Sequence, residues 1–162
     1  MGFRRGDFVV YPKYGVGKVV DSEERPVYGR MQRCLKINFP ADNRTVFINE
    51  QDFQRVHLRQ VMGSKALTDV YKVLKAPSRY GRLRPARTRT DNYRSKASIA
   101  DPVSLAEVAR DLTRRGRTHR LNETERELAD VAVDLLTEEI AFVEKRKPDK
   151  VRTKLDRLLG VS

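Results

Sequence analysis

The sequence predicts an α+β protein of two domains, a small five-stranded β-barrel in residues 1–62 and an all-α domain of four or five helices in residues 63–162. In the first part, short apolar–polar alternations are separated by turn signals roughly every 8–12 residues, which is typical of a small, strongly bent barrel of the SH3 or Tudor type. After Gly63 the apolar residues recur at 3–4 spacing, which indicates amphipathic helices. A chain of 162 residues with 39% hydrophobic content can form two small cores.

Alternation and turn residues define the strands of the barrel. The expected strands, in chain order, comprise residues 7–12, 14–26, 30–40, 45–50 and 53–59. Gly15 and Gly17 permit a tight turn or a close backbone approach in the second strand. Leu35, Ile37 and Phe39 alternate in the third, and the ADNR segment after it indicates a hairpin. An open edge strand of such a barrel can pair with a strand from a partner.

Capping residues delimit the helices. Ser64 precedes a helix at 65–75, and Asp101 with Pro102 begins the third helix, which Gly116 ends. Asn122 with Glu125 begins the longest helix, and Lys145–Lys147 lie at its end. Pro148 begins the last helix and Gly160 ends it. A second helix, poor in apolar residues, is expected from Thr88 to Ala97. The last three helices each present leucines and valines at helical spacing and therefore predict a shared core.

Basic charge is concentrated between the two predicted domains. The formal net charge is +12, and residues 61–100 carry 10 basic and 2 acidic residues, whereas residues 101–162 carry 13 of each. A local excess of this size requires a polyanion, and nucleic acid fits best. The residues expected to contact DNA are Arg79, Arg82, Arg84, Arg87, Arg89, Tyr93, Arg94 and Lys96. Arginine suits phosphate, and Tyr93 could stack on a base.

A second basic group surrounds the helix end at Gly116. It comprises Arg114, Arg115, Arg117, His119 and Arg120. Compensation of the helix dipole accounts for the first two residues but not for the others. For the stretch 79–96, the alternative to a DNA contact is a solvated linker between the domains.

The sequence gives little support to catalysis or to metal binding. Cys34 is the only cysteine, which excludes a disulfide framework and a thiolate metal cluster. His57 and His119 have no metal-ligand spacing, and Glu138 and Glu139 are adjacent on a helix and point in different directions. We therefore expect no cofactor, no metal and no enzymatic activity. No apolar run approaches the roughly 20 residues that span a membrane, so we expect a soluble, cytoplasmic protein.

Several segments together resemble one family. They are FRRGDFVVYPKYGVGKV at residues 3–19, VYKVLKAP at 70–77, LAEVARDLTRRG at 105–116 and LNETERELADVAVDLLTEEIA at 121–141. The chain resembles the bacterial CarD/CdnL family of transcription regulators over nearly its whole length and in the same order. The first segment is also similar to a module of transcription-repair coupling factor, and the helical second half selects the stand-alone regulator.

The resemblance implies a Tudor-like domain that binds the N-terminal lobe of the RNA polymerase β subunit. It also implies a helical domain that contacts promoter DNA, without sequence specificity, near the upstream edge of the transcription bubble and stabilises the open complex. Arg25 matches a basic polymerase-contact position, and Val27 matches the apolar position two residues later. Phe47 stands where relatives often carry a basic contact residue, and the neighbouring Arg44 could supply that charge.

The sequence departs from the family at one position of the helical domain. Relatives carry a tryptophan, followed by basic residues, that wedges against the minor groove, and Ala86 stands at that position here. Alanine cannot replace lost base stacking. Pro85 or Tyr93 could substitute in part, and Arg89 matches one of the following basic positions. The resulting hypothesis is that this protein holds the junction more by charge than by a wedge.

Two other functions stay open at this point. One is an RNA-binding or ribosome-binding basic module, in which both domains contact RNA. The other is a protein adaptor whose basic stretch docks an acidic partner. We expect a monomer that does not bind membranes and is associated with the nucleoid through RNA polymerase.

Overall fold

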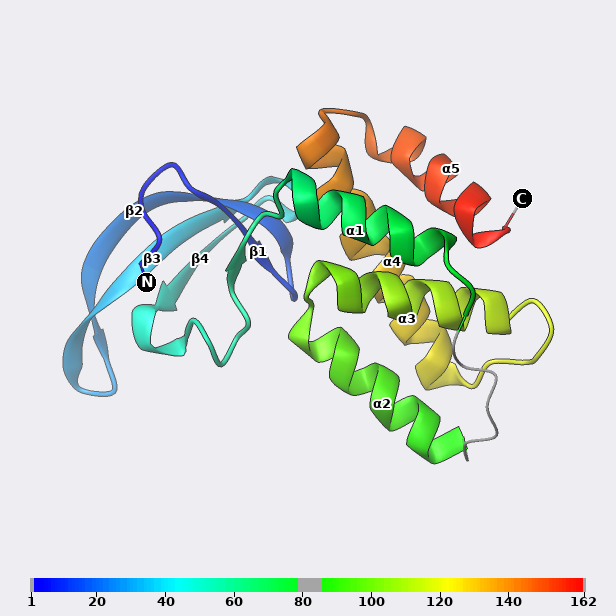
Figure 1. The fold of residues 1–162 in the computed structure, drawn as a ribbon. Coiled ribbons are helices and arrows are strands. Elements are labelled where there is room, and N and C mark those ends of the chain that lie inside the picture. Colours follow the sequence, from blue (N-terminus) through cyan, green and yellow to red (C-terminus); the bar gives the residue numbers. More distant parts are fainter. Residues whose placement is uncertain (1, 79–85, 162) are drawn as a thin grey trace. The chain divides into compact units, whose positions relative to one another are not determined.

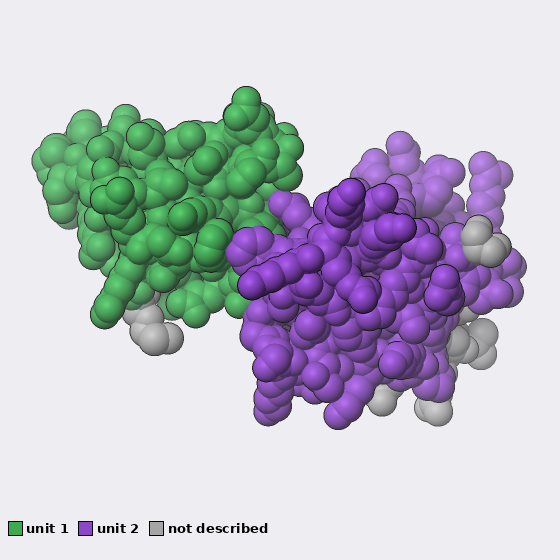
Figure 2. All heavy atoms as spheres, turned by 90° about the horizontal axis from the view of Figure 1, so that it is seen from above, with its two compact units in different colours: residues 1–61 green, residues 62–162 purple. Residues whose placement is uncertain are grey.

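The computed structural model describes residues 2–78 and 86–161 (Figure 1). It divides the chain into two compact units, Met1–Val61 and Met62–Ser162, hereafter the β unit and the helical unit (Figure 2). The described residues form a five-stranded antiparallel sheet followed by five α-helices, which confirms the predicted fold class.

The β unit is one bent antiparallel sheet (Figure 1). Its strands are β1 Phe8–Tyr11, β2 Gly15–Val27, β3 Arg30–Phe39, β4 Arg44–Asn49 and β5 Arg59–Gln60, in the spatial order β4-β3-β2-β1-β5. The core residues are Val9, Val19, Leu35, Ile37, Phe39, Ile48, Phe53 and Leu58. Strand β4 pairs with β3 alone among the described strands, so one of its edges is open.

The two glycines at the start of β2 have different structural roles. Gly15 has a φ of 85°, in the left-handed region that favours glycine, and it follows the turn after β1. A Cβ atom on Gly17 would lie 2.6 Å from a ring carbon of Phe39, which is closer than real Cβ contacts. Gly17 therefore lets the Phe39 ring pack against the backbone of β2 and fill the core.

The fifth predicted strand, residues 53–59, is wrong in its extent, because β5 has only two residues. The Asn49 side chain accepts a hydrogen bond from the backbone N–H of Gln51 and caps a 3₁₀ turn at Glu50–Asp52. The chain then continues through turns that reach His57, which has a φ of 57°. Phe53 and Leu58 are nevertheless buried, so their apolar character predicted that they belong to the core, although the backbone there is not a strand.

The helical unit contains α1 Ser64–Lys75, α2 Ala86–Ile99, α3 Pro102–Arg115, α4 Glu123–Glu144 and α5 Pro148–Leu159. Asp101 and Asn122 cap α3 and α4 as expected, and Asn122 forms a complete capping box with Glu125. Ser64 is not the cap of α1. It is the first helical residue, and Gly63 takes the N-cap position without a side-chain hydrogen bond.

The helices share one core around α3 and α4. Leu74 of α1, Leu105 and Leu112 of α3, and Leu136 of α4 are fully buried in it. Among the described residues, no helix is both long and apolar enough to cross a membrane.

The buried carboxylate of Glu139 binds Met62, the first residue of the helical unit. The Oε2 atom of Glu139 in α4 accepts a hydrogen bond of 2.7 Å from the backbone N–H of Met62, and the Met62 side chain joins the helical core. The compact unit therefore begins at Met62, before α1 itself.

Candidate functional sites

Two residues expected to contact polymerase meet on one face of the β unit. Arg25 in β2 is paired with Gln32 of β3, and Phe47 in β4 is paired with Lys36 of β3. Since residues an even number of positions apart on a strand share a face, Arg25 and Phe47 lie on the same face, across β3. The Arg25 guanidinium carbon is 3.9 Å from the centroid of the Phe47 ring, which makes a close cation–π contact.

This pair, the Arg25–Phe47 patch, is ordered but accessible. Glu23 accepts a hydrogen bond of 3.0 Å from Nη1 of Arg25, and the Arg25 side chain is still 45% exposed. Phe47 is 37% exposed, and the Lys36 ammonium lies 5.9 Å from its ring centroid. The ring supports one face of the guanidinium, and a planar donor group of this kind has the geometry to bind a carboxylate.

Val27 and Arg44 relate differently to the patch. Val27 is the last residue of β2, two positions after Arg25, and therefore lies on the same face. Arg44 lies three positions before Phe47 in β4, on the opposite face. Its guanidinium binds Asp42 at 3.0 Å and lies 4.8 Å from the Tyr14 ring centroid. Arg44 thus lies on the other face of β4 from the Arg25–Phe47 patch and is engaged with Asp42 and Tyr14.

The hairpin tip beside the patch was not among the predicted site residues. Tyr28 and Gly29 form a two-residue turn with positive φ at both positions, between the paired residues Val27 and Arg30. Tyr28 is 95% exposed, and Met31 is also largely exposed. Gly29 is a turn signal in the sequence, because glycine adopts positive φ without steric cost. The outward orientation of an aromatic ring at its tip was the feature that sequence reasoning missed.

Only part of the basic stretch 79–96 lies within the described residues, and that part belongs to α2. Arg79, Arg82 and Arg84 lie outside the described residues, as does Pro85. In α2, Arg87 and Arg94 are exposed, and Arg94 forms a surface ion pair of 3.2 Å with Asp91. Seven positions separate the two arginines, which places them on one helical face.

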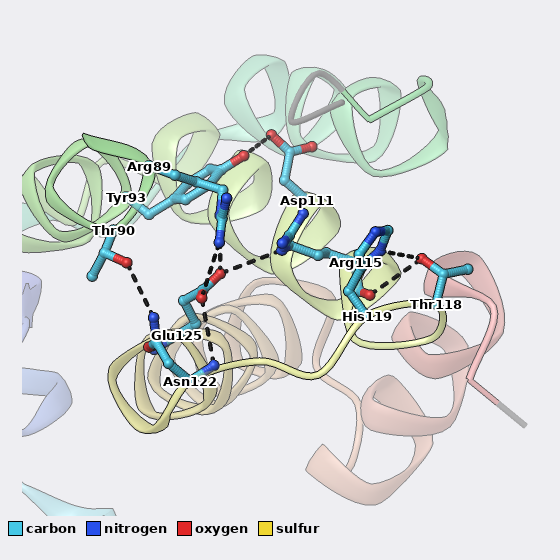
Figure 3. Close-up of polar contacts among 9 residues, drawn as sticks. All are labelled: Arg89, Thr90, Tyr93, Asp111, Arg115, Thr118, His119, Asn122 and Glu125. Carbon is cyan, nitrogen blue, oxygen red and sulfur yellow. Dashed lines mark hydrogen bonds and ion pairs between the residues drawn. The ribbon is translucent and has the colours of Figure 1, made fainter. Parts of the chain in front are cut away.

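Tyr93 does not have the environment of a base-stacking residue. It is 4% exposed, packs in the helical core and donates a hydrogen bond of 2.9 Å from its hydroxyl to Oδ2 of Asp111 (Figure 3). Burial and the Asp111 carboxylate raise the pKa of the Tyr93 hydroxyl, so it remains a proton donor at neutral pH. The burial of the Tyr93 ring contradicts the expectation that it stacks on a base.

Arg89 and Lys96 are engaged within the helical unit. The Nε and Nη2 atoms of Arg89 donate to the Glu125 carboxylate at 3.3 and 3.4 Å (Figure 3). The Lys96 ammonium donates to Glu107 of α3 at 2.6 Å. Both cations therefore hold α2 against its neighbours, and no sequence pattern indicated these acidic partners.

The second basic group also has two environments. Arg114 donates to backbone carbonyls at the ends of two helices, those of Leu74 and Ala76 at 2.6 Å each and that of Leu158 at 3.3 Å. Arg115 forms an ion pair of 3.7 Å with Glu125. Three further members, Arg117, His119 and Arg120, are exposed. Arg114 thus binds helix-end carbonyls of α1 and α5, whereas the sequence interpretation assigned it only to the dipole of its own helix.

The replacement Arg114→Met is expected to lower the free energy of unfolding by about 2–4 kcal/mol, because it leaves helix-end carbonyls without a charged donor. Methionine retains an unbranched apolar side chain. Urea denaturation followed by circular dichroism measures the change. Arg126→Met, at an exposed position of α4, is the matched control and should change stability little. Equal stability of both variants would show that the carbonyl contacts contribute nothing.

The described residues thus place a half-exposed arginine on the sheet of the β unit and two exposed arginines on α2 of the helical unit. Residues 3–62 match the family described as "CarD-like/TRCF RID domain", and residues 69–156 match the family described as "CarD, C-terminal domain". The chain therefore belongs to the CarD family, as the resemblance predicted.

A curated relative agrees with this assignment. The chain is 28% identical over 141 residues to a Bacillus subtilis (strain 168) protein named "Putative transcription factor YdeB", with 87% of this chain and 92% of the relative covered. Family membership indicates transcription regulation that involves RNA polymerase, and it assigns the polymerase-interacting type of domain to the β unit.

Proposed function

We propose that this protein binds the N-terminal lobe of the RNA polymerase β subunit through the Arg25–Phe47 patch and contacts promoter DNA, without sequence preference, through α2 and the basic segment before it. The observation that carries the proposal is the half-exposed Arg25 guanidinium held on the Phe47 ring. It lies in a domain of the polymerase-interacting type.

Two physical features support the polymerase contact. An oriented guanidinium binds a carboxylate through two parallel hydrogen bonds, so the patch suits an acidic side chain on the partner. Phe47 belongs to β4, whose outer edge is open among the described strands and can take up a strand from a partner by main-chain hydrogen bonds. The strand would supply affinity, and Arg25 with Val27 would supply specificity.

Charge supports the DNA contact. Residues 61–100 carry a net charge of +8, and Arg87 and Arg94 present two of these charges on one exposed face of α2. Phosphate contacts of this kind are independent of sequence and weaken steeply with salt. Attachment to polymerase compensates for that weakness, because tethering can raise the local concentration of a contact to about the millimolar range.

The expected outcome is stabilisation of the open promoter complex near the upstream edge of the bubble. The chain contains no tryptophan, and Ala86 stands where relatives carry the wedge. The contribution of DNA binding should therefore be mainly electrostatic, with a log–log salt slope of about −0.9 for each phosphate contacted.

Binding of the full chain to the purified N-terminal lobe of the β subunit, without nucleic acid, tests the first half of the proposal. We expect a one-to-one complex in calorimetry. A chain that binds RNA but not the lobe would instead be an RNA-binding module. A chain that binds the lobe but shows no salt-dependent affinity for DNA would be a protein adaptor.

A further inference from the structure

Helix α2 is attached to the helical unit largely by polar contacts. Its residues are mostly Arg, Thr, Asp, Asn, Ser and Lys, and Tyr93 is its one large buried side chain among the described residues. The contacts, from its N-terminal to its C-terminal end, are Arg89 with Glu125, Thr90 with Asn122, Tyr93 with Asp111, and Lys96 with Glu107. Tertiary packing usually stabilises helices in proteins, so a helix with so small an apolar face depends on these contacts.

The contact between Arg89 and Glu125 is the most enclosed ion pair that α2 makes. The Arg89 side chain is 13% exposed and that of Glu125 is 2% exposed. Glu125 is also the third residue of α4, where its carboxylate accepts the Asn122 backbone N–H in the capping box (Figure 3). Arg115 of α3 approaches the same carboxylate at 3.7 Å. One buried acid thus joins α2, α3 and the start of α4.

The helical period separates this contact from the exposed arginines. Arg87 and Arg94 are seven positions apart and share one face, whereas Arg89 lies two positions, about 200°, from Arg87. Arg89 therefore belongs to the inner face of α2 together with Tyr93 and Lys96. The residue that the family resemblance matched to a DNA contact is directed toward a carboxylate inside the unit.

We infer that the Arg89–Glu125 pair is a latch that fixes α2 on the helical unit and so presents Arg87 and Arg94 to promoter DNA. Arg89 is a positioning residue and not a phosphate contact. This inference rests on the proposed DNA contact for its functional consequence. The effect of the pair on the stability of α2 does not depend on DNA binding and can be measured without DNA.

The variant Glu125→Gln separates the two roles of Arg89 by the sign of its effect on DNA binding. If Arg89 contacted phosphate, removing the acid beside it would release the guanidinium and strengthen binding. If the pair is a latch, the same change weakens binding, because α2 loses its fixed position. Glutamine also suits the capping box, so α4 should keep its start.

The experiment uses the full chain with Glu125→Gln, Arg89→Met and, as control, Glu127→Gln, an exposed position on the same helix with the same change of charge. Native-state hydrogen exchange is read at the amides of residues 90–99 and at those of α4 and α5. We expect exchange in residues 90–99 to rise about tenfold or more in both latch variants, with α4, α5 and the control unchanged.

DNA affinity is measured for the same proteins as a function of salt, with a duplex carrying an open bubble. The latch predicts weaker binding for both Glu125→Gln and Arg89→Met. Stronger binding for Glu125→Gln with weaker binding for Arg89→Met would overturn it and make Arg89 a phosphate contact. Uniform loss of protection across all helices would also overturn it. A wild-type protein without DNA affinity would contradict the proposed function, while the exchange in residues 90–99 would still decide whether the latch exists.

Discussion

Replacing Arg25 with glutamate is expected to weaken binding to RNA polymerase at least about thirtyfold and to leave binding to free DNA unchanged. The substitution removes the cation that rests on Phe47 and places a carboxylate opposite the acidic partner. Loss of a central arginine in an interface commonly costs about 2 kcal/mol or more, and like charges add to the loss. Calorimetry with the β-subunit lobe and fluorescence anisotropy with labelled DNA measure the two affinities.

Arg33→Glu is the matched control for this prediction. Arg33 is exposed in β3, one position from Gln32, and therefore lies on the opposite face of the sheet from Arg25. It changes net charge by the same amount and should leave polymerase binding within about twofold of wild type. Equal losses from Arg25→Glu and Arg33→Glu would mean that general charge, rather than the Arg25–Phe47 patch, determines the interaction.

Neutralising Arg87 and Arg94 together should weaken DNA binding and leave polymerase binding unchanged. With both replaced by glutamine, we expect the log–log salt slope of DNA binding to become shallower by about 1.8, which corresponds to two lost phosphate contacts. Polymerase affinity should be unchanged, because both residues lie in the helical unit. Affinity titrations with DNA across a range of salt concentrations measure the slope.

The control is a double replacement of Arg126 and Lys150 by glutamine. Both are exposed in the helical unit, in α4 and α5, and their loss changes net charge equally. The same reduction in slope from this pair would show that DNA responds to the total charge of the protein. An unchanged slope for Arg87 and Arg94 would identify the exposed face of α2 as a solvated surface.

Local signals in the sequence were sufficient for the fold class. Asp101 and Asn122 cap helices because a side-chain oxygen can satisfy an N–H two or three residues away. The predicted strand at residues 53–59 was wrong because Phe53 and Leu58 are both buried although the chain there forms turns, and apolar residues alone do not distinguish turns from a strand. Ser64 was displaced as a cap because Gly63 adopts the extended N-cap conformation.

The sites depended on pairings between distant residues, and these were not predictable. Arg89 and Tyr93 read as DNA contacts because their neighbours are basic. Their partners Glu125 and Asp111 lie 36 and 18 positions away and are brought near only by helix packing. A basic stretch therefore predicts that a surface is positively charged, but it does not show which of its residues are exposed.

The Arg25–Phe47 patch also depends on a contact that the sequence alone does not reveal. Arg25 and Phe47 were each expected at an interface, and the sequence contained no signal that they form one stacked pair. That pairing follows from the register of β3 with its two neighbours, which places the strands side by side. Phe47, at a position that the family resemblance describes as often basic, here supports the Arg25 guanidinium.

The most direct test of the central proposal is promoter opening by the matching RNA polymerase, followed with a fluorescent base placed in the bubble. With this protein added, we predict a higher or longer-lived open signal, which Arg25→Glu abolishes and which the paired replacement of Arg87 and Arg94 reduces in a salt-dependent way. An unchanged open signal while polymerase binding is intact would contradict the proposal, because the protein would then be attached to polymerase without stabilising the open complex.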